Sequence, residues 1–148
     1  MEQRKKGETD HPKRDLPERT FGFARRVMKL CQSLDQAPGV SRTLANQLLR
    51  SGTSIGANVE ERQGSQSWAD FIAKYSIACK EARETNYWLR LHAASEIVID
   101  LDFKDMIYES HQLNAILIAI IKKARKKRLR FWITFYLTRT DSDQWLQP

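Results

Sequence analysis

The sequence predicts an all-α protein, an antiparallel up-down-up-down four-helix bundle followed by a basic and aromatic C-terminal extension. Apolar residues recur at three- and four-residue spacing through four long segments, which is the pattern of helices with one buried face. Six glycines and four prolines are few for an all-β chain of 148 residues, whose many turns require more of both. Short connections between the segments favour helices that pack antiparallel to their neighbours.

Composition divides the chain into three regions. Residues 1–14 are predicted to be a disordered basic tail, because they lack apolar periodicity and contain Gly7 and Pro12. Residues 15–125 are predicted to form the bundle. Residues 126–148 form an extension whose structure the pattern leaves open. Aromatic and β-branched residues alternate there from Phe131 to Thr138, which fits either an added strand or a continuation of the fourth helix.

The sequence also bears on cellular location. It contains no run of about 18 uncharged apolar residues, so we expect no transmembrane helix and no membrane partner. The first twenty residues lack the apolar segment of a secretion signal, and we expect a cytoplasmic protein. Cys31 and Cys79 lie within apolar helical patterns. Buried free thiols are expected at both positions, with a disulfide or a metal pair as the alternative.

The first helix is predicted to begin after Asp15, a residue type that caps helices, with Pro17 in its first turn. It ends before the Ala-Pro-Gly sequence at residues 37–39. Its apolar stripe consists of Phe23, Ala24, Val27, Leu30, Cys31 and Leu34.

The second helix is predicted to open at Ser41. Gly64 is expected to end it, in the left-handed conformation that glycine favours. The stripe of this helix consists of Leu44, Leu48, Ser51, Ile55 and Val59.

The third helix is predicted to start at Ser67 and Asp70, whose spacing resembles a capping box. Besides its inner stripe it carries a second apolar edge. This surplus indicates a subunit interface formed by Tyr87, Trp88 and Leu91. The apolar face of the fourth helix extends from residue 103 to residue 124.

Small residues dominate the sequence SGTSIGA within the second helix. Gly52 and Gly56 are four residues apart and share one helix face with Ser51 nearby. No lysine follows the glycines and no strand precedes them, which excludes a phosphate-binding P-loop. Two glycines inside a helix cost about 1 kcal/mol each relative to alanine. We therefore interpret Ser51, Gly52 and Gly56 as a helix-packing site where a neighbouring helix approaches closely.

The positive charge is concentrated in one place. The run KKARKKRLR at residues 122–130 holds seven of the 25 basic residues, and the other 18 equal the 18 acidic residues in number. A block of one sign often binds an anionic partner. We predict nucleic-acid binding by Lys122, Lys123, Arg125, Lys126, Lys127, Arg128 and Arg130. An acidic protein, a lipid surface and simple solvation are the alternatives, and the aromatic tail beside the run fits either base stacking or coverage of a subunit surface.

No motif of a catalytic, cofactor or metal site is found. Di-iron bundles need Glu-x-x-His pairs on facing helices, and the one such pair, Glu8 and His11, lies in the N-terminal tail. Neither a nucleophile elbow nor a metal-ligand spacing is present. Glu81 and Glu84 are expected to pair with neighbouring cations, including Lys80 and Arg83. We expect a non-enzymatic protein without cofactors or metal.

Three blocks, ERTFGFARRVMKLC, QLLRSGTSIGANVEE and WADFIAKYSIACKEARETNYWLRL, closely resemble the four-helix-bundle family of proteins encoded in intervening sequences of bacterial 23S ribosomal RNA genes. The resemblance covers residues 16 to 125. It implies an up-down protomer that assembles into a ring-like homopentamer and carries no catalytic centre. Distant relatives are accessory subunits of reverse transcriptases in diversity-generating retroelements, which bind the transcriptase and nucleic acid. The extension after residue 125 departs from the family pattern.

Two functions are therefore expected from the sequence. The first is a homo-oligomeric bundle that binds RNA or DNA through a basic surface. The second is a protein-interaction accessory subunit, for example of a reverse transcriptase.

Overall fold

The computed structural model describes residues 15–36, 39–95 and 103–140, so the predictions for residues 1–14 and 141–148 lie outside these ranges. The described residues form four α-helices and contain no strand. The all-α prediction is therefore confirmed for them. The helices are α1 (Leu16–Asp35), α2 (Val40–Glu61), α3 (Trp68–Ser95) and α4 (Lys104–Thr140), and a short 3-10 helix, η1 (Arg62–Gly64), follows α2.

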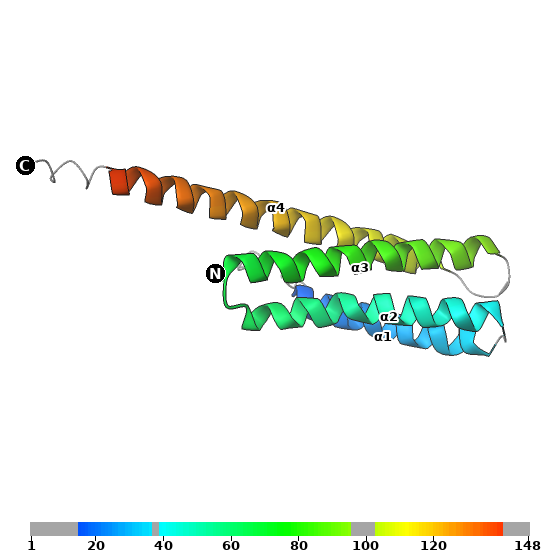
Figure 1. Ribbon diagram of the computed structural model, residues 1–148. Coiled ribbons are helices and arrows are strands. Elements are labelled where there is room, and N and C mark those ends of the chain that lie inside the picture. Colours follow the sequence, from blue (N-terminus) through cyan, green and yellow to red (C-terminus); the bar gives the residue numbers. More distant parts are fainter. Residues whose placement is uncertain (1–14, 37–38, 96–102, 141–148) are drawn as a thin grey trace, which may run out of the picture.

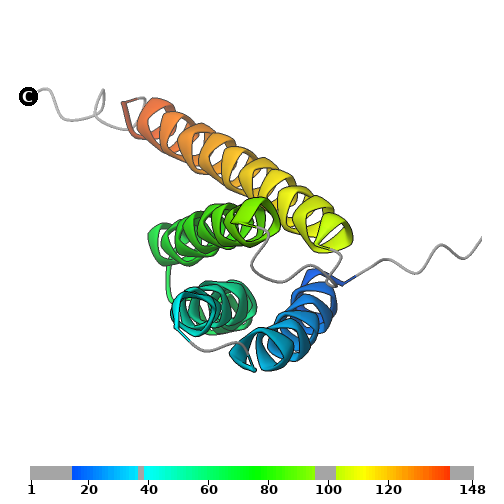
Figure 2. The same ribbon diagram turned by 90° about the vertical axis from the view of Figure 1, so that its right-hand side faces the viewer.

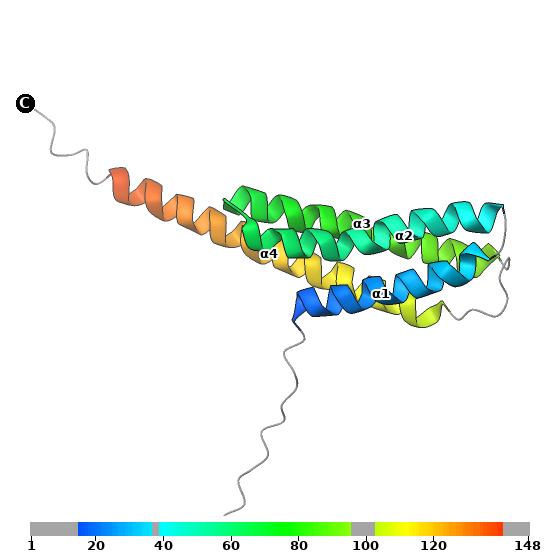
Figure 3. The same cartoon turned by 90° about the horizontal axis from the view of Figure 1, so that it is seen from below.

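Each helix packs against the next one in the chain and runs in the opposite direction (Figure 1). α1 meets α4 over a much shorter length than it meets α2, and α4 diverges from α1 (Figure 2). Near the start of both helices, the Arg19 guanidinium donates hydrogen bonds of 2.7 and 2.9 Å to the Glu109 carboxylate. The far end of α4 extends past the start of α3, as Figure 3 shows from below.

The core lies along the contacts between consecutive helices. Buried side chains recur at three- and four-residue spacing in each helix, because residues at that spacing share a face. Both cysteines are buried free thiols, as expected, and burial raises the pKa of Cys31 to about 11. The largest apolar side chains that are fully buried are Phe23, Val27, Leu34, Leu48, Ile55, Val59, Leu89, Leu113 and Leu117.

The two glycines of α2 lie against α1 but in unequal space. A Cβ atom added at Gly52 would lie 2.8 and 2.9 Å from the two methyl carbons of Val27, which is fully buried. A Cβ atom added at Gly56 would lie 3.5 Å from the carbonyl oxygen of Thr20, an ordinary van der Waals distance. The close approach of the two helices therefore depends on the absence of a side chain at Gly52.

Two predicted boundaries of the second helix are corrected. α2 begins at Val40, after Gly39, whose φ of 83° suits a residue without a Cβ. Ser41 does not open the helix, and its hydroxyl donates a 3.2 Å hydrogen bond to the carbonyl of Leu34. Gly64 is not left-handed, because the chain leaves α2 through the right-handed turns of η1, and Gly39 is the only described glycine with a positive φ.

The start of α3 agrees with its capping pattern. The helix begins at Trp68, directly after Ser67. The backbone N–H of Asp70 donates a 3.1 Å hydrogen bond to the Ser67 hydroxyl, and an Asp70 carboxylate oxygen accepts one from the Gln66 N–H at 3.3 Å. These bonds satisfy backbone groups that a helix start leaves without helical partners.

α4 passes without interruption through the predicted boundary between residues 125 and 126. The segment from Phe131, which fitted a strand or a helix, is helical up to Thr140. An existing helix adds residues at little cost, so aromatic and β-branched residues extend it readily.

His92 joins three helices at one end of the bundle. It is buried in α3, and its ring stacks on Phe103 at 5.9 Å between centroids with planes 7° apart. Burial lowers the pKa of His92, and the backbone of Leu44 in α2 partly opposes this effect. The Nε2 atom of His92 has no hydrogen-bond partner among the described residues.

The glycine geometry predicts opposite effects for two similar substitutions. Gly52→Ala should destabilise the protein by about 1–3 kcal/mol, because the added methyl overlaps the buried Val27. Gly56→Ala is its matched control, and it should be neutral or stabilise by up to about 1 kcal/mol through helix propensity. Urea unfolding followed by circular dichroism measures both. Equal effects at the two positions would contradict this account of the packing.

Burial of His92 predicts an acid-sensitive fold. The unfolded chain binds a proton at the ordinary pKa of 6.5, whereas folded His92 resists protonation, so the free energy of unfolding should fall as pH drops below that value. Urea midpoints at about pH 7.5 and about pH 5 measure the fall. His92→Gln should reduce it, while His111→Gln, at an exposed position, should leave it unchanged. An undiminished fall in His92→Gln would refute the assignment.

Candidate nucleic-acid interface

The predicted basic run lies in α4, and one of its residues, Lys127, contacts the start of α3. All seven of its cations are exposed, whereas Ala124 between them is buried. The Nζ atom of Lys127 lies 5.1 Å from the ring centroid of Trp68 at the start of α3, within cation–π range. None of the seven cations forms an ion pair with a residue that the structure describes.

A groove between α3 and α4 adjoins this run. Its volume is about 280 Å³. Lys80 and Arg83 of α3 line it from one side, and Lys122 and Arg125 of α4 line it from the other. The remaining lining residues are Ser76, Cys79, Ile118 and Ile121. The groove therefore combines cations from two helices with an apolar wall, and it extends the basic surface of α4 onto α3.

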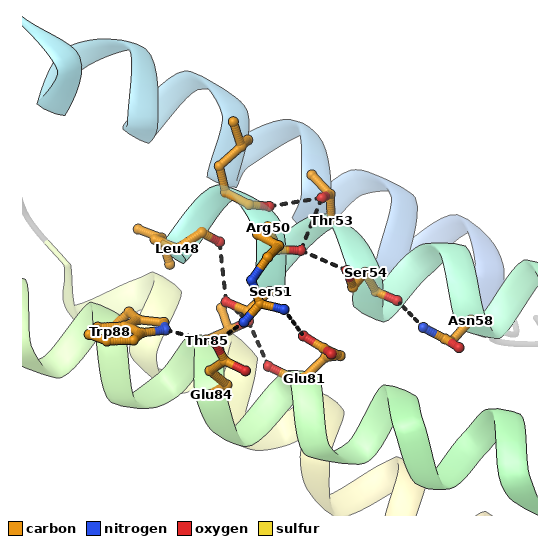
Figure 4. A network of polar contacts seen from close by, with 11 residues as sticks. Leu48, Arg50, Ser51, Thr53, Ser54, Asn58, Glu81, Glu84, Thr85 and Trp88 are labelled. Atoms are coloured by element: carbon orange, nitrogen blue, oxygen red, sulfur yellow. Dashed lines mark hydrogen bonds and ion pairs between the residues drawn. The ribbon is translucent and has the colours of Figure 1, made fainter. Parts of the chain in front are cut away.

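Lys80 and Arg83 were not predicted as binding residues, because Glu81 and Glu84 beside them in the sequence were expected to neutralise them. The carboxylates pair with Arg50 of α2 instead (Figure 4). Arg50 donates a hydrogen bond to Glu84, and its guanidinium lies 3.9 Å from Glu81. Neither Lys80 nor Arg83 forms an ion pair with a described residue. The spacing of α3 gave no signal of this, because residues 80 and 84 are one turn apart and share a helix face, and the observed partner Arg50 lies in another helix.

The electrostatics of Glu81 follow from its position between α2 and α3. Burial raises the pKa of this carboxyl group, the charge of Glu84 raises it further, and Arg50 opposes both effects. The indole N–H of Trp88 donates a 3.1 Å hydrogen bond to Glu84, so the second carboxylate is also held on this side. The acidic charge of central α3 thus lies toward α2, and its basic charge lies toward α4.

Two asparagines set the register of α3 against α4. The Asn86 amide donates hydrogen bonds to the carbonyl of Ile107 at 3.2 Å and to the hydroxyl of Ser110 at 2.9 Å. The thiol of Cys79 donates to the side-chain oxygen of Asn114 at 3.1 Å. These contacts hold the two walls of the groove at a fixed offset along the helices.

The helix-packing residues lie on two sides of α2. Gly52 and Gly56 face α1, as described above. The Ser51 hydroxyl is buried and lies 3.1 Å from the Thr85 hydroxyl of α3, within the polar contacts shown in Figure 4. None of the three lines the basic groove.

The predicted subunit-interface residues lie on the outer face of α3. The side chain of Tyr87 is 52% exposed, and Trp88 and Leu91 are half-buried. The rings of Tyr87 and Trp88 pack edge to face at 4.9 Å between centroids. The three side chains therefore present an apolar patch, which lies in the same helix as Lys80 and Arg83.

The basic surface combines exposed cations with an apolar wall. Cations without acidic partners attract polyanions, and an apolar wall favours a ligand that carries flat apolar groups between its charges. Among the residues that the structure describes, no three His, Cys, Asp or Glu side chains are grouped to hold a metal ion. None of the described helices is long and apolar enough to cross a membrane.

Comparison with known proteins shows the family to which residues 14–119 are similar. The model of the 23S rRNA-intervening sequence proteins matches residues 14–119, which is more than half of the chain and ends before Lys122. A crystal structure of a protein of unknown function from the S23 ribosomal protein family of Bacteroides thetaiotaomicron VPI-5482 is also similar. It shares 41% sequence identity with a TM-score of 0.67, and the match covers 73% of this chain and 99% of that chain. No curated protein matches. This chain therefore belongs to the family of 23S rRNA-intervening sequence proteins.

Proposed function

We propose that this chain is a non-enzymatic, cytoplasmic, homo-oligomeric protein that binds RNA or DNA through the basic surface of α4 and the groove between α3 and α4. The observation that carries this proposal is the cluster of Lys80, Arg83, Lys122 and Arg125 around one groove, none of them in an ion pair with a described residue. Unpaired cations repel each other, and a bound polyanion relieves that repulsion.

The arrangement of the basic run supports a nucleic acid over a flat anionic surface. Each residue of a helix is turned by about 100° from the one before, so seven cations at residues 122–130 point to every side of α4. A lipid surface reaches only one side of a helix. A nucleic-acid strand can follow the groove and continue across the other sides of α4, where it meets further cations.

The oligomer in this proposal is the ring-like homopentamer of antiparallel up-down-up-down protomers that the family resemblance implies. The outer face of α3 supports it, because Tyr87, Trp88 and Leu91 leave apolar area exposed that a second protomer would cover. A ring would repeat the basic surface once in each protomer and raise the local concentration of cations.

The same apolar patch suits a second function. An accessory subunit of a larger enzyme, such as the reverse transcriptase of a diversity-generating retroelement, would dock a protein on this face of α3. Co-purification of the full chain with such an enzyme, and its loss in a Tyr87→Arg variant, would favour docking over self-assembly.

Nucleic-acid binding through this surface predicts a steep salt dependence. Log affinity falls with log salt, and the steepness of this fall is about 0.9 for each phosphate that the protein neutralises on duplex DNA. The double variant Lys80→Gln with Arg83→Gln neutralises two phosphates fewer, so the fall should become shallower by roughly 2. Changing all seven cations of the run to glutamine should flatten it further. Fluorescence anisotropy with labelled duplexes at several salt concentrations measures the slopes.

The matched control for the groove pair is Arg25→Gln with Arg26→Gln. Both residues are exposed on α1, and neither forms an ion pair with a described residue. This variant has the same net charge as the groove variant and should keep the slope of the parent. Equal losses in both variants would mean that net charge, not the groove, determines binding.

Assembly through the outer face of α3 predicts the mass in solution. Light scattering after gel filtration should give about five times the 17.3 kDa protomer mass. Tyr87→Arg should lower the mass, because a charge at a buried interface is costly. Tyr108→Arg alters another exposed tyrosine, in α4, and should keep the mass of the parent. A monomeric parent, or the same mass in both variants, would contradict the proposed interface.

A further inference from the structure

The last described part of α4 presents aromatic rings to solvent. Lys127, over Trp68, marks the place where α4 passes the start of α3. Beyond it the helix continues past the bundle (Figure 1). Phe131, Trp132 and Phe135 are 65%, 50% and 43% exposed there. Exposed apolar area of this kind marks an interaction surface.

One of these rings, that of Trp132, continues the line of the basic groove. Residues three and four apart lie on the same side of a helix, and the series Ile118, Lys122, Arg125, Leu129, Trp132 has this spacing throughout. Its first three members line the groove. Trp132 lies two helical turns beyond Arg125, or about 10 Å along the axis. A ligand that leaves the groove along α4 therefore meets Leu129 and then Trp132.

The three rings form one cluster. Trp132 packs edge to face against Phe131 and Phe135, with centroids 6.4 and 6.0 Å apart. Phe131 and Phe135 lie one turn apart with their planes within 15° of parallel. The contacts among the rings reduce their freedom to rotate, so that less conformational entropy is lost when a flat ligand stacks on them.

The positive charge of this part of α4 favours an anionic ligand over a second copy of the chain. Residues 122–140 contain eight basic and no acidic residues. Pairing with the same segment of a second copy would bring sixteen cations together, which repulsion opposes. A single-stranded nucleic acid supplies both of the required properties, because its phosphates match the cations and its unpaired bases have flat faces that stack on aromatic rings.

We propose that α4 is a binding site for single-stranded nucleic acid, in which the groove cations hold the backbone and Phe131, Trp132 and Phe135 stack with unpaired bases. This inference rests on the proposed nucleic-acid binding and adds its substrate class. A duplex keeps its bases stacked inside and offers the rings little, so the same chain should bind a single strand more tightly than a duplex of equal length.

The experiment measures the contribution of the bases to affinity separately from that of the phosphates. Fluorescence anisotropy compares the full chain on three labelled probes of about 20 nucleotides, namely oligothymidine, an abasic strand that retains the phosphates, and a duplex. Oligothymidine should bind at least about fivefold more tightly than the abasic strand, because stacking contributes to the first alone. The variant Phe131→Leu with Trp132→Leu should abolish this preference and leave the affinity for the abasic strand unchanged.

Matched variants distinguish stacking from general apolar contact. Leucine keeps apolar bulk at positions 131 and 132, so a partner that needs only apolar area should still bind this variant. Ile133→Ala removes an exposed aliphatic side chain from the same turn and should preserve oligothymidine affinity. Trp132→Phe retains a ring and should restore part of the preference in the presence of Phe131.

The outcomes separate the two proposals. Absence of binding by the parent to every probe would reject the nucleic-acid function as a whole. Binding of all three probes with equal affinity, or an unchanged preference in the leucine variant, would reject base stacking and leave the electrostatic site intact. A leucine variant that loses oligomer mass while keeping its preference for oligothymidine would assign the rings to self-association and overturn this inference.

Discussion

The packing of α4 against α3 positions both surfaces for which binding is proposed. Hydrogen bonds from Asn86 and Cys79 cross this interface, to Ser110 and Asn114. A slip of one residue along the helix would leave these polar groups without partners while also moving apolar side chains out of the core, and each of these changes is costly. The register is therefore fixed by polar and apolar requirements together. Fixing it aligns the cations of the two helices along the same groove.

The ion pairs between α2 and α3 affect the charge near the groove between α3 and α4. Arg50 of α2 pairs with Glu81 and Glu84, whereas Lys80 and Arg83 line the groove and form no ion pair with a described residue. A surface ion pair contributes little to stability. We expect its larger effect to be on the charge beside the groove, because Arg50 offsets the charge of two carboxylates that are close in sequence to Lys80 and Arg83.

The sequence predicts the helices well because their apolar residues repeat with the helical period, and that repeat needs no knowledge of tertiary contacts. It also indicates that Gly52 and Gly56 pack closely, but the difference between them depends on Val27 and Thr20 in another helix. Glu81 and Glu84 pair with a cation as expected, but Lys80 and Arg83 are not the partners, since the observed partner Arg50 lies 31 and 34 residues away in the sequence. The alternation after Phe131 fitted two structures, and continuity with an existing helix decided between them.

The uninterrupted course of α4 through residues 121–140 links the geometry of the extension to that of the core. Because no loop separates them, the direction in which Trp132 points is set by the rotation of the helix at Arg125. A single inserted residue between these positions would turn the Trp132 ring by about 100° around the helix axis, away from the line of the groove. Seven residues make nearly two full turns and would restore the direction. An insertion or deletion in this part of α4 therefore keeps the alignment only when it adds or removes a number of residues close to whole turns, such as seven or eleven.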